Sequence, residues 1–202
     1  MTMRIPRAGR EGRDGGEGCR CTGDGGAVLV EAVFIFPVIV FITLAILEYG
    51  MLFAASSTTQ SATRDGARFA SANFAVAGSN QAAADEVMAA VEQDLSARTG
   101  FDTPIQMLVY KADSNGNPVS GTLASCSGSC YHYTWNGTSF AYDASSPQWT
   151  NPQACINNVN PIDSIGVYVE LRHDFITHAF GSSQTLKEHT VTRLEPLPLT
   201  QC

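Results

Sequence analysis

The segment that decides the fold is Gly26–Gly50, which reads GAVLVEAVFIFPVIVFITLAILEYG. From Ala32 to Leu47 it contains no charged residue. A helix that crosses a bilayer needs about 20 predominantly apolar residues at a rise of about 1.5 Å each. A single segment in lipid must be helical because all its backbone N–H and C=O groups have to be bonded internally. The sequence therefore predicts a long N-terminal transmembrane helix over about residues 28–55.

Two glutamates flank the charge-free stretch and need an explanation. Glu31 and Glu48 are seventeen positions apart, or about 25 Å along a helix, and a hydrocarbon core is about 30 Å thick. A carboxylate at the centre of a bilayer costs several kcal/mol. Either both glutamates lie near the headgroups, one in each leaflet, or Glu31 has a functional role. Pro37 removes one backbone hydrogen bond and predicts a kink between them.

The residues before the helix give Glu31 that functional interpretation. Residues 1–25 are rich in Gly and Arg and contain no apolar cluster, and Glu31 is the fifth residue after Gly26. This arrangement resembles the processing site of type IV prepilins. The resemblance implies that a prepilin peptidase cuts between Gly26 and Ala27 and removes residues 1–26 as a cytoplasmic leader. It also implies that the new terminal amine and Glu31 help subunits to dock, since buried charges tolerate apolar surroundings only when paired.

A wider set of residues resembles the TadE-like family of the tight-adherence (Flp) pilus system, over about residues 25–70. The matching positions are Gly26, Val30-Glu31, Pro37, Glu48-Tyr49-Gly50 and Ala62-Thr63-Arg64-Asp65-Gly66-Ala67-Arg68. Asp65 departs from the pattern, because Glu is more usual there. The resemblance implies a minor pseudopilin-like, non-catalytic component of pilus assembly, with Glu31, Glu48 and Pro37 in subunit docking. The implied partners are the prepilin peptidase, other pilins or pseudopilins, and inner-membrane pilus assembly proteins.

The distribution of charge predicts the topology. Residues 1–26 carry five arginines against four acidic residues, and residues 57–202 carry seven basic against thirteen acidic side chains. A basic excess before the helix favours a cytoplasmic N-terminus. An acidic C-terminal part does not suit nucleic acid or anionic lipid. We therefore expect a single-pass protein of the cytoplasmic (inner) membrane, with an extracytoplasmic domain at residues 79–202.

The cysteines agree with an oxidising compartment for that domain. Cys19 and Cys21 would be lost with the leader, which leaves Cys126, Cys130, Cys155 and Cys202. An even number suggests two disulfides with three possible connectivities, of which we favour Cys126–Cys130 and Cys155–Cys202. The alternative is a metal site with His132, but a C-x₃-C spacing with one nearby His is poor for zinc.

The remaining periodicities predict an α+β fold anchored by the long helix. The helix is expected to run on past the membrane to about Phe74. A second, amphipathic helix at residues 81–98 has an apolar stripe at 3–4 spacing. Residues 105–111, 131–135, 139–142, 165–175 and 185–195 are expected strands of a small antiparallel sheet, with a hairpin at Asn136-Gly137. The apolar stripe consists of Ala84, Val87, Met88, Val91 and Leu95.

No catalytic motif is found in the sequence. There is no G-x-S-x-G, no H-E-x-x-H and no phosphate-binding loop, and the turn at residues 113–118 lacks the Gly and Glu positions of a calcium loop. We therefore predict a protein that is not an enzyme and has no cofactor or metal. The alternative function is an unprocessed single-pass membrane protein with an extracellular binding domain. The mature N-terminus distinguishes the two.

Overall fold

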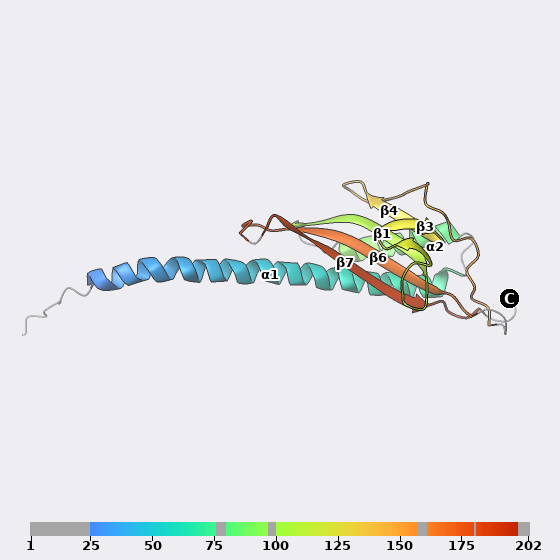
Figure 1. The fold of residues 1–202 in the computed structure, drawn as a ribbon, viewed down its shortest axis with the longest axis horizontal. Helices are drawn as coiled ribbons and strands as arrows, with labels where there is room; N and C mark the ends of the chain where they lie inside the picture. The colour runs from blue at the N-terminus through green and yellow to red at the C-terminus, as the bar shows by residue number, and fades with distance from the viewer. Residues whose placement is uncertain (1–24, 76–79, 97–99, 157–160, 180, 198–202) are drawn as a thin grey trace, which may run out of the picture. The chain divides into compact units, whose positions relative to one another are not determined.

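The computed structural model describes residues 25–75, 80–96, 100–156, 161–179 and 181–197. The chain forms two compact units, Met1–Ile42 and Thr43–Cys202. Two helices precede all the strands in the chain (Figure 1), which confirms the predicted α+β class. The elements are α1 (Gly25–Asn73), α2 (Asn80–Leu95), β1 (Asp102–Ala112), β2 (Ser120–Thr122), β3 (Ser125–Gly128), β4 (Cys130–Trp135), β5 (Phe140–Tyr142), β6 (Ser164–Asp174) and β7 (Ser183–Arg193).

Five of the strands form one antiparallel sheet in the order β5-β4-β1-β6-β7. All five coincide with predicted strands, and the predicted hairpin connects β4 to β5, with Trp135 opposite Phe140. The hairpin of β2 and β3 was not predicted. Its strands contain mainly Ser and Gly and have no alternation of apolar and polar residues, which is the signal that identifies a half-buried strand.

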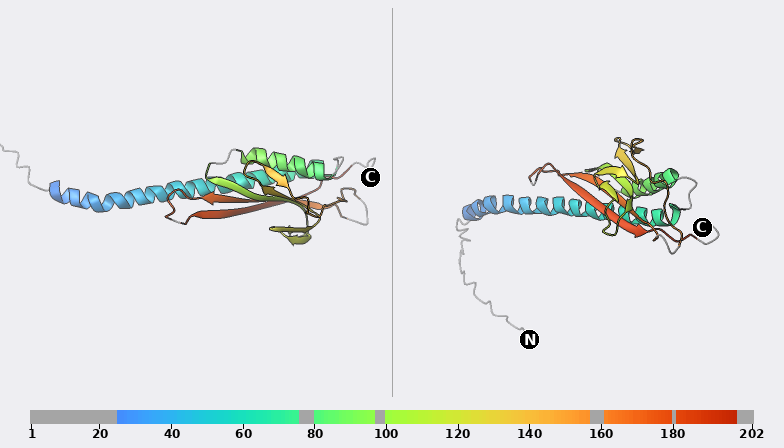
Figure 2. Two further views of the ribbon diagram at one scale, coloured as in Figure 1. Left: turned by 90° about the horizontal axis from the view of Figure 1, so that it is seen from above. Right: turned by 45° about the vertical axis from the view of Figure 1, so that its right-hand side comes forward.

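Helix α2 and the C-terminal half of α1 cover one face of this sheet, and the hairpin of β2 and β3 lies on the other (Figure 2). On the helical face, Val87 and Val91 of α2 join Val109 and Val167 of the sheet in the main core. The predicted stripe of α2 is buried except for Met88, which is half-buried. A smaller cluster on the opposite face has Leu108 and Tyr168 packed with Leu123 from the segment between β2 and β3.

The C-terminal half of α1 is also part of the core, which the sequence analysis did not predict. Its buried positions recur every three or four residues, as on one face of a helix. They are Ala55, Thr59, Ala62, Thr63, Gly66, Ala67, Ala70 and Ser71, and Phe74 directly after the helix is buried as well. Most of these side chains are small, so the helix backbone can approach its neighbours closely.

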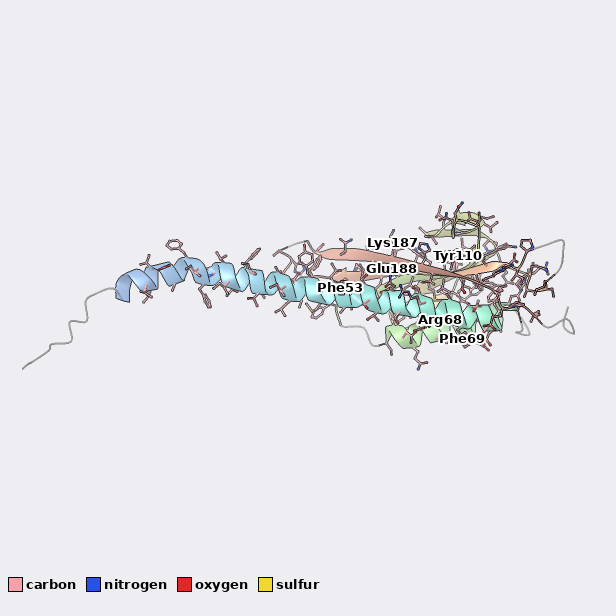
Figure 3. The ribbon with its side chains drawn as sticks, turned by 90° about the horizontal axis from the view of Figure 1, so that it is seen from below. Phe53, Arg68, Phe69, Tyr110, Lys187 and Glu188 are labelled. Carbon is pink, nitrogen blue, oxygen red and sulfur yellow. A yellow bond between two sulfur atoms is a disulfide. The ribbon has the colours of Figure 1, made fainter. Side chains whose placement is uncertain are left out.

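Strand β7 runs alongside this half of α1, and Figure 3 shows Glu188 of β7 beside the helix. Ser56 donates a hydrogen bond to Glu188 at 3.4 Å, and the hydroxyl of Thr190 lies 3.3 Å from that of Thr63. Further along, the backbone N–H of Glu195 donates to the carbonyl of Ser71 at 2.9 Å. Residue numbers rise together along α1 and along β7 with the residues that follow it, so the two segments run in the same direction. The start of β7 therefore lies nearest the middle of α1.

Candidate functional site on the N-terminal helix

The apolar half of α1 exposes its side chains on every side. The large apolar residues between Val28 and Leu47 are 39–73% exposed, and α1 is long and apolar enough to cross a membrane. The helix is continuous through Pro37. A helix that is apolar all round belongs in lipid or among other apolar helices. This segment is therefore a candidate single membrane span.

The predicted processing residues and Glu31 lie at the start of α1. Gly26 and Ala27 follow Gly25, its first residue. The side chain of Glu31 is exposed, and within the described part of the chain no hydrogen bond or ion pair of this carboxylate is found. A carboxylate in an apolar segment needs a partner. The carboxylate of Glu31 is therefore accessible to a partner group on another molecule.

Glu48 differs from Glu31, because it is only 2% exposed. One of its carboxylate oxygens accepts a hydrogen bond from the backbone N–H of Thr177, in the loop between β6 and β7. The second oxygen is buried and has no hydrogen-bond partner among the described residues. The contact joins residues 129 positions apart. No local pattern in the sequence points to it, so Thr177 was missed by the sequence analysis.

Among the described side chains of α1, that of Glu48 is the first that is buried. Glu48 follows directly on Leu47, the last residue of the charge-free stretch. Tyr49 and Gly50 are exposed, and Ala55, about two turns after Glu48, is buried. Glu48 is thus already bonded within its own chain, and of the two glutamates only Glu31 is free of such a bond in the described structure.

The second family motif, Arg64–Arg68, divides between two sides of α1. Gly66 and Ala67 are buried, and a Cβ on Gly66 would lie 2.5 Å from a methyl carbon of Val91 in α2. Arg64, Asp65 and Arg68 are exposed. The ion pair of Arg68 with Asp65 is 3.8 Å long, and such exposed pairs stabilise little. The small residues therefore allow α1 and α2 to pack closely, and the charged residues face solvent.

Three cysteines and His132 of the folded unit have structural partners. The disulfide Cys126–Cys130 is present and confirms that pairing. Cys155 is disulfide-bonded as well, and Cys202, its predicted partner, lies outside the described residues. His132 lies 2.8 Å from the Gln106 carbonyl oxygen and 3.3 Å from Asp143. Among the described residues, no group of three or more His, Cys, Asp or Glu side chains could hold a metal ion.

Comparison with known proteins identifies the segment that contains these residues. Residues 26–68 match the family model described as TadE-like protein, so the match begins at the predicted cleavage position and ends at Arg68. No curated protein and no solved structure matches the chain. TadE-like proteins are components of pilus assembly. The apolar helix of this chain, together with its extension through the Arg64–Arg68 motif, is therefore similar to TadE-like proteins.

Proposed function

We propose that this protein is a minor pseudopilin-like component of tight-adherence pilus assembly. A prepilin peptidase removes residues 1–26, and α1 then holds the protein in the cytoplasmic membrane with the unit that follows on the extracytoplasmic side. The mature helix docks against the helix of a pilin or assembly protein through Glu31. The observation that carries the proposal is the extent of the family match, residues 26–68, which starts at the proposed cut.

The burial pattern of α1 supports a membrane span in its N-terminal half and packing against the folded unit in its C-terminal half. The charge-free residues 32–47 expose their large apolar side chains, whereas Glu48 and Ala55 are buried in the folded unit. The sixteen residues from Ala32 to Leu47 cover about 24 Å at 1.5 Å each, and the apolar residues from Val28 extend the segment to bilayer length. We therefore place the end of the span near Leu47, closer to the N-terminus than the sequence suggested.

The intact mass of the protein purified from its own membranes tests the cleavage. We expect a mature form that begins at Ala27. Gly26→Val should leave the full-length chain, because a branched side chain replaces the small residue after which the peptidase cuts. The matched control is Gly25→Val, which adds the same side chain one position earlier and should still be processed.

Two outcomes of this measurement would contradict the proposal. A parent protein that retains Met1 in cells with an active prepilin peptidase would favour the unprocessed, single-pass binding protein. Equal processing of the Gly26 and Gly25 variants would move the cut away from Gly26.

Substitution of Glu31 tests the docking step. Glu31→Gln keeps the shape of the side chain but removes the charge that pairs with the terminal amine, and paired buried charges are strongly coupled. We expect normal membrane insertion but a severalfold lower recovery of other pilus components in a pull-down. Glu31→Asp keeps the charge and should retain most of the binding. Unchanged recovery with the Gln variant would rule out this role for Glu31.

A further inference from the structure

The loop between β6 and β7 is held at the level where the charge-free helix ends. The N–H of Thr177 donates to Glu48, and Glu48 is the residue directly after Leu47. Because successive helical residues rise by only about 1.5 Å, the loop lies within about one turn of the last apolar residues of α1. Whatever surrounds Leu44 and Leu47 is therefore close to this loop.

The loop is closed by its own hydrogen bonds and turns one apolar side chain outward. The N–H of Phe175 donates to the carbonyl of Ser182 at 3.1 Å, and the N–H of Ala179 donates to the hydroxyl of Thr177 at 3.3 Å. Phe175 is buried and packs edge-on against His173, with 5.5 Å between ring centroids. Ile176, the next residue, is 50% exposed. A large β-branched side chain is thus held in solvent by an ordered loop.

Apart from the buried Glu48, the surroundings of Ile176 carry little unpaired charge. Residues 175–179 contain no Asp, Glu, Lys or Arg, and His178 is the only titratable side chain among them. The flanking Asp174 is paired with Arg172 through contacts of 3.0 and 3.2 Å. Phe101, whose carbonyl accepts the N–H of Asp174 at 2.8 Å, is 40% exposed. This end of the folded unit therefore presents neutral, apolar and aromatic groups.

We propose that residues 175–179 rest on the outer surface of the lipid bilayer and insert the side chain of Ile176 among the headgroups. The bond between Glu48 and Thr177 holds this loop beside Leu44 and Leu47, the last apolar residues of the charge-free stretch. Aromatic and apolar groups such as Tyr49 and Ile176 favour the membrane–water interface. Because residues 57–202 are acidic and do not suit anionic lipid, the contact is an apolar one. The inference rests on the proposed span and not on leader cleavage or a role in pili.

Quenching of tryptophan fluorescence by brominated lipid tests the contact. The full chain is placed in phosphatidylcholine nanodiscs, with or without bromine on the acyl chains, as the variant Ile176→Trp. The parent contains Trp135 and Trp149, so each variant is compared with the parent in the same nanodiscs. We expect the added tryptophan to be quenched severalfold more strongly than one added by Val119→Trp. Val119 is similarly exposed, at 52%, but lies at the opposite end of β1, next to Pro118.

A third variant separates failure of this inference from failure of the span. Phe36→Trp places a tryptophan in the charge-free helix, where the side chain is 68% exposed, and it should be quenched most strongly. Strong quenching at position 36 with equal, weak quenching at positions 176 and 119 would overturn the membrane contact of the loop and keep the span. A lack of quenching at position 36 would overturn both.

Discussion

At the scale of single residues, Gly66 shows how the family motif shapes the fold. It lies inside α1, where Gly is about 1 kcal/mol less favourable than Ala, so its presence needs a reason. The reason is steric, because a Cβ at this position would lie 2.5 Å from Val91 and 3.6 Å from Val167. The glycine lets α2 and β6 reach the backbone of α1.

Gly66→Ala should therefore destabilise the folded unit despite the better helix propensity of Ala. Overpacking typically costs 1–3 kcal/mol, and the 2.5 Å approach to Val91 favours the upper end of that range. Because the propensity gain is about 1 kcal/mol, we expect the free energy of unfolding to fall by about 2 kcal/mol. Urea unfolding in detergent micelles measures it. Gly50→Ala is the matched control, because nothing lies within 4 Å of a Cβ there. A Gly66 variant as stable as the Gly50 variant would contradict the packing argument.

At the scale of elements, a row of polar side chains links four strands on the sheet face opposite the helices. The Gln106 amide on β1 donates to Glu170 on β6 at 2.6 Å, and Tyr168 donates to the same oxygen at 2.9 Å. Lys187 on β7 lies 3.5 Å from the other carboxylate oxygen. His132 on β4 completes the row through the Gln106 carbonyl oxygen. The partners lie side by side because Glu170 is opposite both Gln106 and Lys187 in the register.

This row makes the stability of the sheet depend on pH. Burial by itself raises the pKa of Glu170, but the hydrogen bonds from Gln106 and Tyr168 and the charge of Lys187 outweigh it and lower the pKa below 4.5. A lowered pKa means that the unfolded chain takes up the proton first as pH falls. The stabilisation is thus complete above the ordinary pKa and is lost as pH falls through the lowered one.

We therefore expect the midpoint temperature of unfolding to fall more steeply below pH 5 for the parent than for Glu170→Gln. Thermal melts followed by near-ultraviolet circular dichroism between pH 7 and pH 3 measure this difference. Glu86→Gln, which changes an exposed carboxylate on α2, should keep the pH profile of the parent. A Glu170 variant with the same acid sensitivity as the parent would show that this carboxylate does not cause it.

At the scale of the whole molecule, the disulfides close loops of very different length. Cys126 and Cys130 are four positions apart, whereas the proposed pair Cys155–Cys202 would close most of the C-terminal quarter of the chain. In the chain-entropy model, a bridge stabilises more when the loop it closes is longer. The long bridge would connect the loop after β5 to the chain that follows β7.

We expect the paired Ser substitution of Cys126 and Cys130 to lower the free energy of unfolding by about 2 kcal/mol, and that of Cys155 and Cys202 by about 4 kcal/mol. Urea unfolding compares the two, and replacing both cysteines of a pair leaves no free thiol to re-form bonds. Peptide mapping without reductant should join the Cys155 peptide to the Cys202 peptide. A Cys155 peptide joined to any other cysteine would refute the pairing.

The sequence by itself determined the features that depend on local composition and periodicity. The charge-free stretch between Glu31 and Glu48 specifies an exposed apolar helix independently of how the rest of the chain packs. The stripe through Val87 and Val91 selects the buried face of α2, and the long alternating segments of β6 and β7 specify strands. The family motifs are likewise sequence patterns, so the resemblance could be seen before the fold.

Only the tertiary structure decided which residues meet across long distances in the chain. The C-terminal half of α1 packs through Ala, Ser, Thr and Gly, which differ too little in hydropathy to mark a buried face in the sequence. Glu48 is charged and borders the apolar segment, so its place in the sequence suggested a position near the lipid headgroups. It is buried because the path of the chain brings the N–H of Thr177, 129 residues away, to its carboxylate. That contact depends on how the sheet and helix pack, which no local pattern encodes.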